Sequence, residues 1–262
     1  RDTFEMLHAR GVFVEPKAFS IGFRIEHPQG VIDRARFGDN NRFPGHPKKI
    51  VEQVGAADYK LVHHAKNGRS VYSFCMCPGG TVVAATSETG RVVTNGMSQY
   101  SRLERNANAG IVVGVEPSDF GADAENPLAG IAFQRNLESS AFTLGGESYF
   151  APVQLVGDFL AGRASKALGD VEPSYKPGVL LTDLTGGEEV IPQYVIKAIQ
   201  EALPEFGKKI KGFDRPDSLL TGVETRTSAP IRIRRCAESH PEEFQSINTR
   251  GLYPAGEGAG YA

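Results

Sequence analysis

Residues 59–95 read YKLVHHAKNGRSVYSFCMCPGGTVVAATSETGRVVTN, and this stretch decides the fold class. Aromatic and β-branched residues, which favour strands, are frequent in it, and short glycine-containing links divide it. Links of this length typically join consecutive antiparallel strands. The stretch therefore predicts a run of antiparallel strands at Tyr59–Ala65, Ser70–Cys77, Thr81–Ser87 and Arg91–Asn95.

Strand and helix patterns continue on both sides of this run. Alternating or wholly apolar segments predict strands at Phe19–Ile25, Gly110–Val115, Leu219–Glu224 and Pro230–Arg234. Residues 33–58 are polar and indicate a long excursion. Apolar residues at helical spacing predict helices from Asp2 to Gly11, from Asn126 to Gly145, from Pro152 onward, and from Pro192 to just before Pro204. The expected fold is α+β: a mixed, largely antiparallel sheet or partial barrel with a helical subdomain.

Composition excludes several classes of protein. The chain has 262 residues, of which 40% are hydrophobic and 23% charged, so it can bury a large core without disulfide bonds. A net charge of −2 argues against a nucleic-acid partner. No apolar run reaches the length of about 20 residues that a membrane span needs. Three cysteines and no visible secretory signal predict reduced thiols in a cytoplasmic protein.

Cys75 and Cys77 are the first candidates for chemistry. Residues i and i+2 of a regular strand share a face, so the two thiols are expected to be neighbours. A zinc site would need a matching second pair of ligands, which the sequence lacks, so no metal is predicted. A redox site and two small buried core residues are the other interpretations, and the second is favoured. Asn95 and Met97 are candidates for the wall of the same site.

Two further segments indicate ligand binding. Arg232, Arg234 and Arg235 form a basic edge, which is either a solvated strand face or a site for a carboxylate or pyrophosphate. The terminal residues Gly256, Glu257, Gly258, Ala259 and Gly260 let the backbone approach a ligand closely, and the acid can accept hydrogen bonds from ribose or ribityl hydroxyls. A flexible tail is the alternative interpretation. A chain that opens in helical spacing and stops in a glycine-rich loop is expected to be a piece of a longer polypeptide.

Five stretches taken together resemble a largely uncharacterised group of bacterial FAD-dependent dehydrogenases among the two-dinucleotide-binding-domain flavoproteins. These stretches are Ile21–Gln29, Phe74–Gly80, Val93–Ser98, Thr221–Ser228 and Gly251–Ala262. The resemblance implies that a Rossmann-type FAD domain is mostly absent from this chain. It implies that residues 1–12 end that domain, that residues 13–246 form an inserted substrate or cap domain, and that residues 247–262 return to the FAD domain. Within the insert, residues 13–116 and 219–235 are expected to be β-rich and residues 117–212 helical.

The resemblance also implies a function. Residues 256–260 match the segment that holds the flavin in related proteins, with Glu257 at the position of the acid that binds the ribityl chain. FAD would belong to the intact protein and would not be retained by this chain alone. The substrate is expected to be a small molecule, with NAD(P)H as a possible electron donor. Arg226 follows a predicted strand and is a candidate to bind an anionic substrate or the carbonyl edge of the flavin, with an ion pair to Glu224 or Asp183 as the alternative. A non-catalytic binding or regulatory module attached to a flavoprotein is the second functional hypothesis.

Overall fold

A computed structural model describes residues 1–38, 54–186, 190–236 and 244–261. The chain divides into two compact units. The larger unit comprises residues 21–113 and 137–225, and the smaller unit comprises residues 1–20, 114–136 and 226–262. Each unit is described by itself below.

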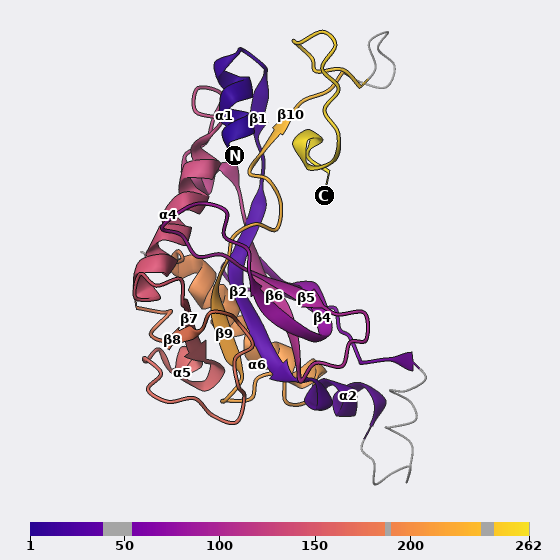
Figure 1. The fold of residues 1–262 in the computed structure, drawn as a ribbon, viewed down its shortest axis with the longest axis vertical. Helices are drawn as coiled ribbons and strands as arrows, with labels where there is room; N and C mark the ends of the chain where they lie inside the picture. Colours follow the sequence, from indigo (N-terminus) through magenta and orange to yellow (C-terminus); the bar gives the residue numbers. More distant parts are fainter. Residues whose placement is uncertain (39–53, 187–189, 237–243, 262) are drawn as a thin grey trace. The chain divides into compact units, whose positions relative to one another are not determined.

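One large sheet organises the larger unit. Within the described residues, eight strands pair in the order β3-β4-β6-β2-β9-β7-β8, with β5 added to β4. Figure 1 shows the central strands side by side. The strands are β2 (Phe19–Pro28), β3 (Val62–His64), β4 (Ser70–Ala84), β5 (Thr94–Ser98), β6 (Asn106–Val115), β7 (Ala151–Leu155), β8 (Val179–Leu181) and β9 (Leu219–Glu224). The sheet is mostly antiparallel, β7 and β8 being a parallel pair, and it is not closed into a barrel.

The central strands are buried on both faces. Every residue from Phe19 to His27 of β2 is buried, as are all six residues of β9. Because no face of β2 meets water, its polar side chains must find partners inside the protein. This burial places Arg24 within the core, where it organises the site described below.

In the described part of the chain, four helices lie between these strands in chain order: α2 (Gln29–Phe37), α4 (Ala129–Leu144), α5 (Val156–Ala161) and α6 (Gln193–Lys209). Figure 1 shows α2 beginning where β2 ends. The longest, α6, buries an apolar stripe from Val195 to Phe206. Phe206 packs edge-on against Phe213, with ring centroids 5.6 Å apart, which continues the core beyond the end of the helix.

A short helix and a strand pair form most of the smaller unit. They are α1 (Asp2–Ala9) and the antiparallel strands β1 (Val14–Pro16) and β10 (Ile231–Ile233). Two 3-10 turns, η1 (Pro117–Phe120) and η2 (Gly256–Ala259), complete its described elements. Val12, Val14 and Ile233 form its small core, and the rings of Phe19, Phe120 and Phe133 pack together nearby.

The structure confirms the α+β class and corrects several predicted elements. The segment after Pro152 is strand β7 followed by the short helix α5, so the region 117–212 is not wholly helical. The two strands predicted at 70–77 and 81–87 are one strand, β4, that bends at bulges instead of turning back. The helix α6 continues through Pro204, and α2 occupies the start of the predicted excursion. Residues 39–53 of that excursion lie outside the described residues.

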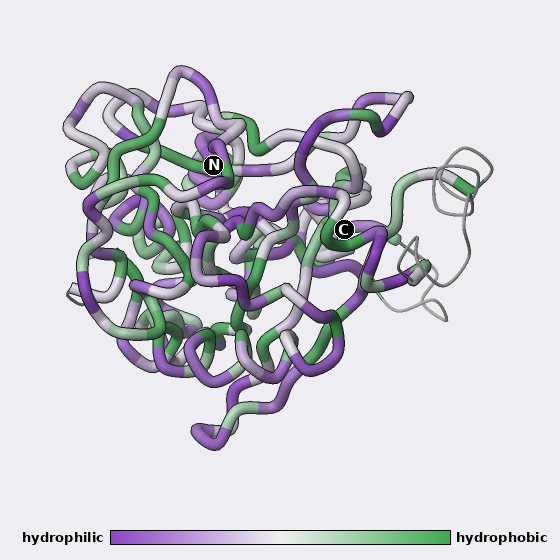
Figure 2. The backbone as a smooth tube through the Cα atoms, turned by 90° about the horizontal axis from the view of Figure 1, so that it is seen from below, coloured by the Kyte–Doolittle hydropathy of each residue, from purple (hydrophilic) through white to green (hydrophobic). Residues whose placement is uncertain are grey.

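None of the described helices combines the length and the apolar content that a membrane crossing requires. Figure 2 shows hydrophobic and hydrophilic stretches alternating over short distances along the chain.

His27 gives the larger unit a pH-dependent stability. Burial lowers the pKa of this fully buried ring from 6.5 to about 4. The backbone oxygen of Phe213, 2.6 Å from Nε2, and the charge of Asp217 oppose this lowering, whereas the charge of Arg215 adds to it. The unfolded chain therefore binds a proton first as the pH falls, so folding stability decreases below about pH 6.5. We expect His27 to contribute about 2 kcal/mol to the loss of stability between about pH 7 and pH 5.

Urea denaturation at both pH values measures this effect. His27→Gln should lose less stability than the wild type on acidification, whereas His64→Gln, which changes an exposed ring, should behave like the wild type. Equal pH dependence in wild type and His27→Gln would show that His27 does not supply it.

Candidate functional site

A fully buried arginine joins five strands of the larger unit. Arg24 of β2 uses all five of its N–H donors. Its Nε and Nη2 contact the two carboxylate oxygens of Glu224 on β9 at 2.9 and 2.5 Å. Nη1 donates to the backbone oxygen of Cys75 on β4 at 2.9 Å and to Oδ1 of Asn108 on β6 at 3.0 Å. Nη2 also donates to Oδ1 of Asn95 on β5 at 3.2 Å. We call these five residues the Arg24 cluster.

The local sequence makes room for this arrangement. A side chain at Gly96 would place its Cβ 2.2 Å from Oδ1 of Asn108 and 2.3 Å from Nη1 of Arg24. The glycine is therefore required for the guanidinium to lie against β5. The register pairs Cys77 with Asn108 on β4 and β6, which brings the thiol segment beside the guanidinium.

The ion pair between Arg24 and Glu224 is held in a dry environment. Burial raises the pKa of the Glu224 carboxyl, and the adjacent guanidinium opposes that rise. Burial alone would lower the pKa of Arg24, but the Glu224 carboxylate raises it. With both oxygens of Glu224 and all donors of Arg24 occupied, the pair is a rigid scaffold and not an open binding group.

The cluster fixes the orientation of Asn95 at the protein surface. Oδ1 of Asn95 accepts hydrogen bonds from Arg24 and, at 2.8 Å, from the backbone N–H of Gly96. Because Oδ1 faces these two donors, the Nδ2 amide points away from them as a donor. Asn95 is exposed, so this amide is accessible to a ligand.

Asn108 has the same orientation but lies in the interior. Its Oδ1 accepts from Arg24, while its buried Nδ2 has no hydrogen-bond partner among the described residues. A buried donor without a partner is costly and marks a place where a further group would be stabilising.

The thiol segment departs from the regular strand that was predicted. Between Phe74 and Cys77 the register of β4 shifts against β6, and Cys75 adopts a φ of 44°. Cys75 is therefore exposed while Cys77 is buried, so the prediction of two buried core residues is wrong for Cys75. The Cys77 Sγ donates to the backbone oxygen of Cys75 at 3.3 Å. Burial raises the pKa of the Cys77 thiol, and the charge of Arg24 opposes this.

The structure brings together three of the predicted site residues within the larger unit. Cys75 and Asn95 bond directly to Arg24, and Cys77 is adjacent. Arg226 follows β9 and belongs to the smaller unit. The Glu224 carboxylate, one of the two ion-pair partners expected for Arg226, is bonded to Arg24 through both of its oxygens.

Sequence reasoning missed Arg24, Glu224 and Asn108 as site residues. A signal was present, because Arg24 and Glu224 are charged residues within segments whose apolar residues predict strands. Charges at such positions need partners, and two opposite charges in separate buried strands suit one another.

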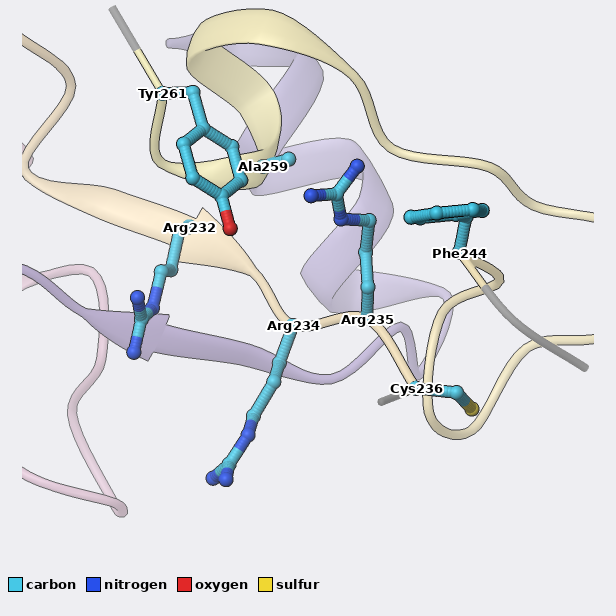
Figure 3. A pocket seen from close by; sticks show the side chains of 7 residues that line it. All are labelled: Arg232, Arg234, Arg235, Cys236, Phe244, Ala259 and Tyr261. Carbon is cyan, nitrogen blue, oxygen red and sulfur yellow. The ribbon is translucent and has the colours of Figure 1, made fainter. Parts of the chain in front are cut away.

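The smaller unit contains a basic pocket of about 250 Å³ (Figure 3). The pocket is lined by Arg232, Arg234, Arg235, Cys236, Phe244, Ala259 and Tyr261. Arg235 extends toward η2 and lies between two aromatic rings, 5.4 Å from that of Phe244 and 4.9 Å from that of Tyr261. Arg232 and Arg234 both pair with the single carboxylate of Glu15, so the predicted basic edge keeps a net positive charge, and its third arginine is flanked by aromatic rings.

The terminal glycine segment lies against this pocket. Ala259 of η2 lines it, and a Cβ at Gly260 would lie 2.8 Å from Cδ of Arg232. Space is open beside Gly256 and Gly258, where an added Cβ would meet nothing within 4 Å. Glu257 is exposed and interacts electrostatically with Lys17, whose pKa is lowered by burial while Glu257 opposes the shift. The segment is therefore an ordered turn in the described residues, with open backbone beside an arginine.

No group of three or more histidine, cysteine or acidic side chains in the described part of the chain is arranged to hold a metal ion.

A family model described as "FAD-dependent protein, C-terminal domain-like" matches residues 18–227. The chain belongs to this family. A relative from Clostridium beijerinckii, called an uncharacterized protein, is 52% identical over 263 residues. The match covers 100% of this chain and 46% of the relative, so the chain spans about half of that protein's length.

The family match separates the two sites. The part that matches the FAD-dependent protein C-terminal domain contains every residue of the Arg24 cluster and ends before the basic pocket at residues 232–261. The Arg24 cluster thus lies within the part of this chain that matches the family domain.

Proposed function

We propose that this chain is the substrate-binding or cap domain of an FAD-dependent oxidoreductase. The observation that carries the proposal is the Arg24 cluster, in which a fully bonded buried arginine fixes Asn95 and Cys75 at the surface of the family domain. In the full-length protein FAD would supply the hydride chemistry. The residues of this domain would bind and orient the substrate.

The geometry of Asn95 suggests the class of substrate. Its Nδ2 amide is an accessible donor with a fixed direction, and it suits a carbonyl or carboxylate oxygen. Preorganised donors of this kind orient a ligand with little loss of side-chain entropy on binding. We therefore propose a small molecule that carries such an oxygen as the substrate, with NAD(P)H as a candidate electron donor.

The basic pocket fits part of FAD. A guanidinium between two aromatic rings, in a pocket that Ala259 of the glycine-rich turn also lines, suits an anionic group such as a phosphate. A volume of about 250 Å³ is below the range of about 300–1,000 Å³ typical of whole small-molecule sites. We propose that residues 256–260 and Arg235 contact one part of FAD, and that the main contacts to the cofactor come from elsewhere in the full-length protein.

Replacing Asn95 tests the role of the Arg24 cluster in substrate binding. In the full-length protein, compounds with a carbonyl or carboxylate would be screened for those that reoxidise the reduced flavin. Asn95→Ala should lower kcat/KM for such a compound about 3- to 10-fold, because one hydrogen bond to the substrate is lost.

Gln99→Ala is the matched control, since it truncates another exposed amide just after β5. The control should retain the wild-type kcat/KM. Equal values for Asn95→Ala and the wild type would remove Asn95 from the site. Arg226→Ala belongs in the same assay, and unchanged turnover would exclude the proposed contact of Arg226 with an anionic substrate.

A further inference from the structure

We propose that Cys75 and Cys77 form a redox-active dithiol that small-molecule disulfides convert into an internal disulfide. The proposal rests on the geometry of β4 and the Arg24 cluster. It is independent of flavin binding and of the nature of the substrate.

A β-bulge separates the two cysteines, and the Cys77 sulfur lies against the backbone of Cys75. In a regular strand the Cβ atoms of residues i and i+2 lie about 6–7 Å apart, whereas a disulfide needs about 3.5–4.5 Å. The register pairs Phe74 with Gly110 and Cys77 with Asn108, so β4 holds one residue more than β6 across this step. The extra residue and the left-handed conformation of Cys75 (φ 44°) take the segment out of regular strand geometry, and the Cys77 Sγ lies 3.3 Å from the backbone oxygen of Cys75.

The two thiols have unequal access to solvent. Cys75 is exposed, while Cys77 is 6% exposed and donates its S–H to the backbone oxygen of Cys75. This division matches that of dithiol sites in which an exposed thiol attacks and a covered thiol resolves the intermediate.

Arg24 supplies a fixed positive charge to the pair. Its guanidinium bonds to the Cys75 backbone oxygen at 2.9 Å, and its charge interacts favourably with the thiolate of either cysteine. The Glu224 carboxylate acts in the opposite sense on Cys77. Thiolate, and not thiol, is the attacking species, and the hydrogen bond from Arg24 holds in place the backbone that carries the exposed Cys75 sulfur.

The reaction is a pair of thiol–disulfide exchanges. The Cys75 thiolate attacks one sulfur of a disulfide RSSR, such as oxidised glutathione, and forms Cys75–S–S–R while one RS⁻ leaves. The Cys77 thiol then gives its proton to solvent and attacks the Cys75 sulfur, which releases the second RS⁻. The protein loses two protons and two electrons, and one RSSR takes up both and becomes two RSH.

The test treats the full-length protein with oxidised glutathione and follows intact mass, with peptide mapping to locate each product. The wild type should lose two hydrogens between Cys75 and Cys77 and accumulate no glutathione adduct there. Cys77→Ser should keep one glutathionyl group on Cys75, because the resolving thiol is gone. Cys75→Ser should react at residue 77 at least about tenfold more slowly than Cys77→Ser reacts at residue 75, since Cys77 is buried.

Cys236→Ser is the matched control, because Cys236 is half-buried and lies in the smaller unit. This variant should form the Cys75–Cys77 disulfide as the wild type does. Circular dichroism of each variant establishes that it is folded. The proposal is overturned if folded wild-type protein keeps a glutathionyl group on Cys75 without closing the disulfide. It is equally overturned if Cys75→Ser reacts at residue 77 as fast as Cys77→Ser reacts at residue 75.

Discussion

Arg24→Ala should lower the free energy of unfolding by about 3–5 kcal/mol. The substitution removes the partner of a carboxylate that is buried in β9, and it takes one donor from each of the oxygens of Asn95, Asn108 and Cys75. An uncompensated buried charge is among the largest single destabilisations known for point mutants. Urea denaturation followed by circular dichroism measures the loss.

An exposed ion pair provides the control. Lys208→Ala breaks the Lys208–Glu205 pair on the surface of α6 and should change the free energy of unfolding by less than about 1 kcal/mol. The double variant Arg24→Met, Glu224→Leu should be more stable than Arg24→Ala, because it removes the buried charge together with its partner. If Arg24→Ala and Lys208→Ala lose similar stability, Arg24 is not the centre of a buried network.

Gly22→Ala should destabilise the sheet by at least about 3 kcal/mol, near the upper limit for overpacking in a core. A Cβ at this position of β2 would lie 1.9 Å from the backbone oxygen of Ile111 on β6. Backbone cannot move aside as a flexible side chain can, so the two strands would have to separate. The same urea denaturation detects the change, and loss of folded protein on expression would be its extreme form.

Gly114→Ala is the matched control within β6, because an added Cβ there meets nothing within 4 Å. Alanine also restricts the unfolded chain more than glycine does, so this variant should be neutral or slightly more stable. A Gly22→Ala protein as stable as Gly114→Ala would contradict the close approach of β2 and β6.

Strand positions were readable from the sequence because residue patterns along the chain report them locally. Leu219–Glu224 matches β9, and the helix predicted from Asn126 to Gly145 corresponds to α4. Pro152 was misassigned because the residues from 152 to 160 fit both helical spacing and a buried strand followed by one helical turn. Pro204 predicts the end of a helix, yet α6 continues to Lys209. Its buried face extends to Phe206, and this tertiary packing outweighs the unfavourable helix propensity of proline.

The candidate site depends on contacts that local patterns do not report. Arg24 and Glu224 are 200 residues apart, and their contact follows from the pairing of β2 with β9. Cys75 and Cys77 were identified as neighbours, but their difference in exposure arises from a bulge set by the register against β6. Asn95 was selected as a wall residue, while the direction of its amide depends on a guanidinium from another strand.

The central claim is that this chain is a domain of a flavoprotein and that the main contacts to FAD lie outside the chain. The visible absorption spectrum tests this claim most directly. The purified 262-residue chain and the full-length protein would be incubated with FAD, desalted and compared. We predict flavin bands in the full-length protein and none in the 262-residue chain. Stoichiometric flavin in the chain alone, or none in the full-length protein, would contradict the account.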